Sequence, residues 1–194
     1  MIHPDTELRF INSTMGLGVF ATQLIPRGTI TWVQDCLDYT FSREEFARQA
    51  SLFRPTLDKY SFMGPDGSFV LCWDIARYVN HSCNPPCLSA GYDFEFAVRD
   101  IQAGEEITDD YGTLNMEEDF CCACNQPGCR KKILADDLVT YGDEWDAIIA
   151  EAFPLIAQVQ QPMWNLVKEK DELEMIFAGK APIASCRGNY YRGV

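Results

Sequence analysis

The chain has 194 residues, of which 47% are hydrophobic and 23% charged, and this composition predicts one globular domain or one domain with an appendage. Its apolar stretches are far shorter than the ~18 residues of a membrane span, and its first residues lack a basic region followed by an apolar one. We therefore expect no membrane insertion, no Sec-type export, and an intracellular location, cytoplasmic or nuclear. The net charge of −13 opposes direct binding to nucleic acid and favours a cationic partner.

The first half of the chain is predicted to be mainly β. Glycine-containing turns and a loop over 64–67, which predicts a hairpin, separate several short apolar segments. The last of these alternates, with Phe94 and Phe96 on a buried face and Glu95 on the polar face. The predicted strands cover residues 8–12, 19–22, 29–33, 60–63, 68–73, 93–99 and 105–108.

Three helices are predicted. Ser42 and Glu45 have the spacing of a capping box, which predicts a short helix through about residue 52. Apolar residues at three- and four-residue spacings predict two further helices over 143–160 and 162–177, the second with Pro162 in its first turn. The last residues, 186–194, have no strong periodicity and are predicted to be loosely ordered.

Nine cysteines are an odd number for a disulfide framework, so metal ligation or free thiols are the better interpretation. Cys36, Cys72 and Cys186 are scattered and are predicted to be buried or half-buried apolar residues. The pattern C-x-C-x4-C, in contrast, places three soft donors within eight residues, and tetrahedral zinc requires one more. The candidates for this metal site are Cys122, Cys124 and Cys129, with Cys83, Cys87 or Cys121 as the fourth ligand.

Three other patterns are weak when each is taken alone. The sequence Gly16-Leu17-Gly18 allows a ligand to approach the backbone closely, but a turn between strands also needs glycine. Residues 80–85 are a polar run that could satisfy its own backbone, and a Cys-His nucleophile pair there lacks a third, orienting group. A tyrosine after a strand, such as Tyr111, is usually a half-buried packing residue, and aspartates beside it usually face water.

The order of these motifs is more specific than any one of them. The G-x-G pattern, then R-Y-V-N-H-S-C-N-P over 77–85, G-E-E-I-T-D-D-Y-G over 104–112 and C-x-C-x4-C-R over 122–130 follow one another. In this arrangement, residues 7–134 resemble the SET-domain protein lysine methyltransferases with a post-SET zinc segment. The resemblance implies a SET-domain fold of small sheets with a pseudoknot over 1–114 and a post-SET zinc-binding segment over 115–134. Residues 135–194 would form a helical, two-helix C-terminal extension.

The resemblance also implies an S-adenosylmethionine-dependent protein-lysine N-methyltransferase that acts on a basic protein or peptide segment, such as a histone tail. Zn²⁺ would be structural, because in-line transfer of a methyl group to a neutral amine needs positioning rather than a metal. The implied sites are catalytic Tyr111; cofactor-binding Met15, Gly16, Leu17, Gly18, Asn80 and His81; substrate-channel Tyr60, Phe62 and Asp109; and zinc-binding Cys83, Cys122, Cys124 and Cys129.

Two residues depart from the pattern of the family. Asp109 stands where many members carry Phe or Tyr, and Trp32 lies in a segment that commonly contains tyrosine. The smaller Asp109 predicts room for an amine that is already methylated. The main rival interpretation is a catalytically inactive, zinc-stabilised SET-fold interaction module, against which the presence of Asn80, His81 and Tyr111 counts.

Overall fold

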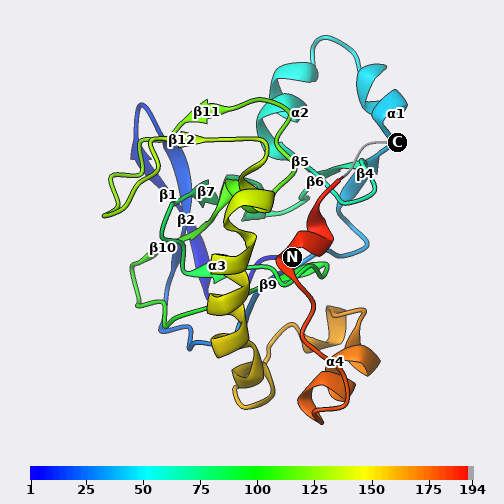
Figure 1. Cartoon of the computed structure of the whole chain (residues 1–194). Coiled ribbons are helices and arrows are strands. Elements are labelled where there is room, and N and C mark those ends of the chain that lie inside the picture. The colour runs from blue at the N-terminus through cyan, green and yellow to red at the C-terminus, as the bar shows by residue number, and fades with distance from the viewer. Residues whose placement is uncertain (192–194) are drawn as a thin grey trace.

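The computed structural model describes residues 1–191, which form four small β-sheets flanked by helices (Figure 1). This agrees with the mainly β fold predicted from the sequence. Among the described residues, none of the helices is long and apolar enough to cross a membrane. The strands are β1 (Thr6–Asn12), β2 (Gly16–Ala21), β3 (Ile30–Val33), β4 (Tyr39–Phe41), β5 (Ser61–Met63), β6 (Phe69–Leu71), β7 (Asn80–His81), β8 (Cys87–Leu88), β9 (Phe94–Ala97), β10 (Glu106–Asp109), β11 (Phe120–Cys121) and β12 (Lys132–Ile133).

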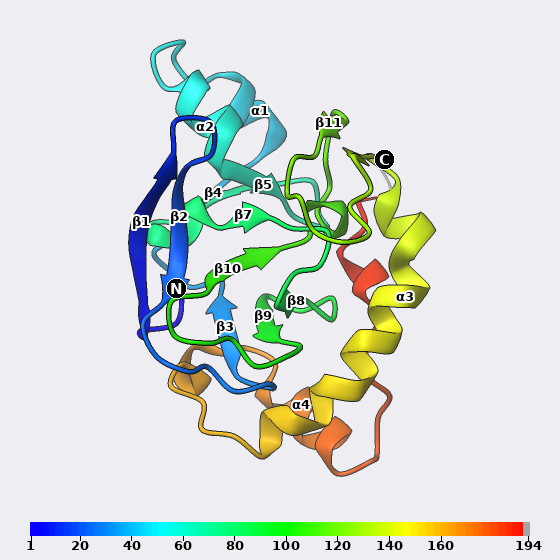
Figure 2. The ribbon, with the colours of Figure 1, turned by 90° about the vertical axis from the view of Figure 1, so that its left-hand side faces the viewer.

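The largest sheet joins parts of the chain that are distant in sequence. Its strand order is β1-β2-β10-β7, so β10 lies between β2 and β7 (Figure 2). Strand β10 pairs antiparallel with β2, where Ile107 is opposite Val19, and parallel with β7, where Asp109 is opposite His81. The two motifs at 80–85 and 104–112 therefore lie side by side.

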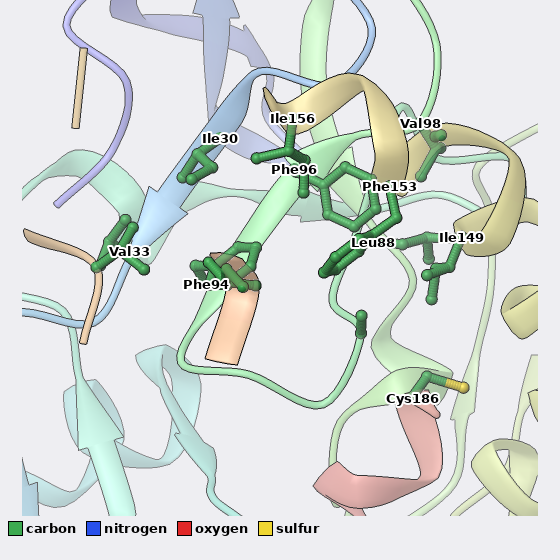
Figure 3. Packing of buried hydrophobic residues seen from close by; sticks show 14 of the residues in the cluster. Ile30, Val33, Leu88, Phe94, Phe96, Val98, Ile149, Phe153, Ile156 and Cys186 are labelled. Carbon is green, nitrogen blue, oxygen red and sulfur yellow. The ribbon is translucent and has the colours of Figure 1, made fainter. Parts of the chain in front are cut away.

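A second sheet, with strand order β3-β9-β8, carries the main hydrophobic core (Figure 3). Phe94 and Phe96 have no exposed surface, which confirms the buried face predicted for this strand. They pack with Phe153 and Ile149 from the helical C-terminal part, so the extension and the β-sheets share one core. Complete burial of each such large apolar side chain stabilises the fold by about 1.5–3 kcal/mol relative to its exposure.

The third sheet, β4-β6-β5, contains the predicted hairpin and lies next to two short helices. The capping box at Ser42 and Glu45 is present and starts α1 (Arg43–Ala47). The prediction of a helix through residue 52 was wrong, because α1 ends at Ala47 and a separate helix, α2 (Arg54–Tyr60), follows. Pro55 lies in the first turn of α2, where its missing N–H costs no hydrogen bond.

The C-terminal helices are α3 (Asp137–Ala152) and α4 (Lys170–Phe177), and α4 lies at the opposite end of the molecule from α1 and α2 (Figure 2). The helix predicted over 143–160 begins six residues earlier, at Asp137, and ends at Ala152. A short 3-10 turn, η3 (Phe153–Ala157), follows it. The second helix prediction was wrong over 162–169, where only the 3-10 turn η4 (Trp164–Leu166) forms. The chain then becomes extended at Val167, whose side chain is buried in the core.

The segment after α4 was predicted to be loosely ordered, and this was wrong for residues 186–191. It contains the 3-10 turn η5 (Cys186–Asn189), and Cys186 is completely buried in the main core, because Asp146 and Gly142 of α3 accept its hydrogen bonds. Residues 192–194 lie outside the described residues. Cys72 is buried as predicted, but Cys36 is exposed, which corrects that prediction.

Candidate active site

The turn between β1 and β2 carries the glycine motif. The side chain of Asn12 shapes this turn, since its Oδ1 accepts the backbone N–H groups of Thr14 and Met15 at 2.9 and 2.8 Å. Gly16 follows with a φ of +81°, a backbone conformation that residues other than glycine rarely adopt. The turn therefore presents a fixed backbone at the residues that were predicted to bind a cofactor.

Asn80 connects this turn to the central sheet. Its Nδ2 donates to the carbonyl oxygen of Leu17 at 3.0 Å and to Oε1 of Glu106 at 2.8 Å. A Cβ atom on Gly18 would lie only 2.5 Å from Glu106 Oε1 and 2.7 Å from Ile11 Cδ1, so a larger residue here would displace the ends of these two side chains. The structure thus brings Leu17 and Gly18 together with Asn80, whose side-chain Oδ1 remains a hydrogen-bond acceptor because both of these bonds use Nδ2.

Tyr111 lies two residues after the end of β10. It is held by His81 of β7 and by Val79, the residue that precedes β7. The backbone N–H of Ser82 donates to the carbonyl oxygen of Asp109 at 2.8 Å. The backbone N–H of Tyr111 donates to Nδ1 of His81 at 3.1 Å, and its hydroxyl donates to the carbonyl oxygen of Val79 at 2.8 Å. Both ends of this tyrosine are therefore fixed against the 80–85 motif.

The imidazole of His81 is buried, and burial lowers its pKa to about 4. Because Nδ1 accepts from Tyr111, the proton of the neutral ring lies on Nε2, which is 3.2 Å from Sγ of Cys83. His81 therefore donates to a cysteine sulfur. Its side chain is committed to Tyr111 and Cys83, so only its backbone is left to contact a cofactor.

Four cysteine sulfurs gather beside His81. The Sγ of Cys122 is 3.7 Å from Sγ of Cys83 and 3.6 Å from Sγ of Cys129, and it accepts the backbone N–H of Cys124 at 3.4 Å. Zinc–sulfur bonds of about 2.3 Å in a tetrahedron give sulfur–sulfur separations of about 3.8 Å. The two sulfur–sulfur distances at Cys122 therefore agree with the spacing of ligands in a tetrahedral zinc site.

The ligand atoms of His81, Cys83, Cys122 and Cys124 all lie within 4.8 Å of one another. His81 is thus a further candidate that the sequence did not suggest, and as a ligand its Nε2 would lose the proton that it otherwise donates to Cys83. Of the alternatives considered from the sequence, Cys87 is completely buried in β8, opposite Ala97, and Cys121 is exposed on β11. Neither belongs to this group of ligand atoms. The geometry therefore favours Cys83 over both as the fourth thiolate.

A buried ion pair connects the cysteine segment to the turn at Tyr111. The guanidinium of Arg130 donates to both carboxylate oxygens of Asp110, at 2.8 and 2.5 Å, and Asp110 has no exposed surface. Arg130 also lies 3.3 Å from Asp137 at the start of α3 and over the rings of Tyr141 and Trp145. This network was missed in the sequence, where the aspartates beside Tyr111 were expected to face water.

A cavity of about 690 Å³ opens on the other side of Tyr111. Tyr60, Phe62 and Asp109, the three predicted channel residues, all line it together with Tyr111. Trp32 also lines it and packs edge-on against Phe62, with ring centroids 5.7 Å apart. Asp109 is only 7% exposed, which excludes the alternative in which it points into solvent.

Glu95 is a second carboxyl group on the wall of this cavity, and the sequence placed it on a polar, outward face. Burial, followed by the proximity of the two carboxyl groups, raises the pKa of Asp109, and burial raises that of Glu95 to about 7. The alternation of β9 was thus correct, but its polar face meets the cavity instead of bulk water. Burial also raises the pKa of the Tyr111 hydroxyl, which stays protonated at neutral pH.

The SET domain family model matches residues 16–112. This range contains the glycine turn, the 80–85 motif and Tyr111. The chain belongs to the SET domain family. The match begins at the glycine turn and ends one residue after Tyr111. The resemblance seen in the sequence is therefore confirmed for the SET domain itself.

Several curated relatives are also SET proteins. The histone-lysine N-methyltransferase Set2 of Drosophila melanogaster is 31% identical over 150 residues, which cover 71% of this chain and 6% of the relative. The histone-lysine N-methyltransferase ash1 of the same species is 32% identical over 143 residues, or 66% of this chain and 6% of the relative. An H3 lysine-4 specific histone-lysine N-methyltransferase of Candida albicans is 41% identical over 66 residues, or 29% of this chain. The chain thus spans only about 6% of the length of these relatives.

The SET domain match does not include Cys122, Cys124, Cys129 or Arg130. The link between the SET domain and the cysteine segment therefore rests on this structure, through the contact of Cys83 with Cys122 and the ion pair of Asp110 with Arg130. Arg130, the last residue of the C-x-C-x4-C-R pattern, was visible in the sequence. Nothing there indicated that its partner in the ion pair is Asp110.

Proposed function

We propose that this SET domain transfers a methyl group from S-adenosylmethionine to the side-chain nitrogen of a lysine in a basic protein segment. The supporting observation is the place of Tyr111. Tyr111 lines the aromatic cavity, and its backbone N–H donates to His81. His81 is next to Asn80, which in turn donates to the carbonyl oxygen of Leu17 in the glycine motif. One residue thus connects a place suited to a lysine side chain with a place suited to the methyl donor.

On the donor side, we propose that residues 15–18 and Asn80 bind the cofactor, with His81 contributing its backbone. The fit rests on the half-buried backbone of residues 15–17 and on the side-chain Oδ1 of Asn80, which can accept an N–H from the ligand because the contacts to Leu17 and Glu106 use only Nδ2. S-adenosylmethionine, when bound, supplies an electrophilic methyl group. The chain's own contribution is to fix the direction of approach, because alignment of the reacting atoms is the main requirement of an in-line displacement.

On the acceptor side, we propose that Tyr60 and Phe62 line the lysine channel and that Tyr111 is catalytic. The Tyr111 hydroxyl stays protonated, so it does not remove the lysine proton. It donates to Val79, and this bond holds the phenolic oxygen in place to accept weak C–H···O contacts from the methyl group. Its role is therefore to position the reacting groups.

We propose that the four cysteines bind one structural zinc ion and that residues 115–134 form a post-SET segment. Zinc would hold this segment against β7, next to the residues that fix Tyr111. Residues 135–194 form the third part of the proposed division after 1–114 and 115–134. They support the site through the core that they share with β9 and through the contact of Asp137 with Arg130.

The test is transfer of a radiolabelled methyl group from S-adenosylmethionine to histones and to a bacterial lysate, followed by mapping of the modified residue. Tyr111→Phe should lower turnover by orders of magnitude while calorimetric affinity for the cofactor changes little. Asn80→Ala should weaken that affinity directly. Equal losses of cofactor affinity in the two variants would contradict the role proposed for Tyr111.

The same assays address the rival function, an inactive SET-fold interaction module. That rival requires cofactor binding without methyl transfer to any protein or peptide across a broad panel. The −13 charge supports a basic substrate, because an acidic protein attracts cationic segments over several ångströms. Preference for acidic peptides in the same panel would contradict this part of the proposal.

A further inference from the structure

Two carboxyl groups from different strands meet on the wall of the aromatic cavity. Asp109 ends β10 and Glu95 lies in β9, and both residues line the cavity, where the charge of Glu95 raises the pKa of Asp109. Asp109 is 7% exposed, and its Oδ1 is buried without any hydrogen-bond partner. Buried polar atoms are nearly always bonded, so this oxygen points to a ligand that would satisfy it.

The chain itself does not neutralise the pair. Among the described residues, neither Glu95 nor Asp109 forms an ion pair with a lysine or arginine, although basic residues lie elsewhere around the cavity. Arg77 donates to the carbonyl oxygens of Trp73 and Asp74, and Arg54 pairs with Asp58. Lys59, the remaining basic residue on the cavity wall, lies over the ring of Tyr60, with its Nζ 4.9 Å from the ring centroid. No cation of the described residues therefore complements the carboxyl pair.

The surrounding walls suit a cation. Trp32 is opposite Glu95 in the pairing of β3 with β9, and it packs against Phe62. Aromatic faces attract cations, and the low polarity of such walls strengthens the interaction between opposite charges. Burial raises the pKa of both carboxyl groups, as expected for acids that have no compensating positive charge beside them.

We propose that Glu95 and Asp109 together form the receptor for a primary ammonium group, with Glu95 acting as a selectivity residue beside Asp109. The unpartnered Oδ1 of Asp109 accepts one N–H, and the aromatic walls contact the carbon chain behind it. The identification of this ammonium as the head of a lysine rests on the proposed function. The receptor discriminates against a neutral side chain of the same length and against a quaternary ammonium, which has charge but no N–H to donate.

The test uses three small probes in the intact chain without cofactor: n-butylammonium, 1-butanol and tetramethylammonium. Binding is followed by NMR titration of the Trp32 indole resonance. Butylammonium should bind about ten- to a hundredfold more tightly than butanol, the range expected for hydrogen bonds to a charged group, and more tightly than tetramethylammonium. Glu95→Gln and Asp109→Asn should each lower the affinity for butylammonium by about tenfold, with unchanged butanol binding showing that the cavity remains folded.

Glu7→Gln is the matched control, because Glu7 is an exposed strand carboxylate outside the cavity. It should leave all three affinities unchanged. Equal binding of butylammonium and butanol, or unchanged ammonium binding in Glu95→Gln, would overturn the receptor. Tetramethylammonium binding as tightly as butylammonium would also overturn it, in favour of a purely aromatic cation site.

This experiment is independent of the proposed function. The probe pattern together with an absence of methyl transfer would leave the receptor standing and refute the transferase. Methyl transfer without the probe pattern would do the reverse.

Discussion

Replacement of Arg130 by methionine tests how strongly the cysteine segment is tied to the turn at Tyr111. The substitution keeps much of the aliphatic length of the side chain but removes the cation from Asp110, which has no exposed surface. Removal of one partner from a buried ion pair typically costs about 3–5 kcal/mol, because the other charge is left without compensation. We expect Arg130→Met to lower the free energy of unfolding by about this amount, a large part of the stability of a small domain.

The assay is urea unfolding of the zinc-loaded protein at pH 7, followed by tryptophan fluorescence. Lys132→Met is the control, since Lys132 lies two residues further along and forms a 2.8 Å ion pair with Asp119 that is exposed to solvent. It should leave the free energy of unfolding nearly unchanged. Arg130→Met combined with Asp110→Asn should be more stable than Arg130→Met alone, because the uncompensated charge is gone while the bond to the Gly112 N–H can remain. An effect of Arg130→Met as small as that of Lys132→Met would refute the reasoning.

Three further predictions address the metal, the product and the carboxyl pair. Metal analysis of protein purified without chelator should give one zinc per chain, and Cys124→Ser should lose it while the exposed Cys36→Ser retains it; a stoichiometry near zero in the unmodified chain would contradict the site. Mass spectrometry of a methylated peptide should show di- or trimethyl-lysine, and Asp109→Phe should shift the product towards monomethyl-lysine because the ring fills the cavity beside Tyr111. Burial raises the pKa of Glu95 from 4.5 to about 7, so the folded chain binds this proton more tightly than the unfolded chain does. The free energy of unfolding should therefore fall as the pH rises from about 4.5 to 7, and urea titrations should show a weaker dependence in Glu95→Gln; an unchanged dependence would mean that other groups cause it.

Local patterns in the sequence predicted the longer strands, but not the short strands β4, β7, β8, β11 and β12. Alternation identified the buried face of β9 at Phe94 and Phe96, and the capping box placed the start of α1 correctly. The order of the motifs predicted that Asn80 and Tyr111 belong to one site. Only the fold shows that the pairing of β7 with β10 places them side by side. In each case the chemistry needed is contained in a few neighbouring residues.

The errors arose where the surroundings of a residue come from distant parts of the chain. Glu95 has the spacing of a solvent-facing residue, but the face of β9 that carries it lines the cavity. Asp110 looked exposed because its partner, Arg130, lies twenty residues away in sequence. Val167 has helical spacing in the sequence, but in the structure its backbone is extended and its side chain is buried in the core. Such contacts depend on tertiary packing, which periodicity does not encode.

The position of β10 between β2 and β7 also sets an order for folding. The glycine turn and β2 are synthesised early, but β2 has an open edge on one side until Glu106 and Ile107 arrive about 85 residues later to pair with Phe20 and Val19. Contacts of such long sequence separation are slow to form, because the loop must close before the pairing stabilises it. We therefore expect the central sheet and the residues around Tyr111 to form together in a late, cooperative step of folding. Chains that stop before residue 106 would expose an edge strand that favours aggregation.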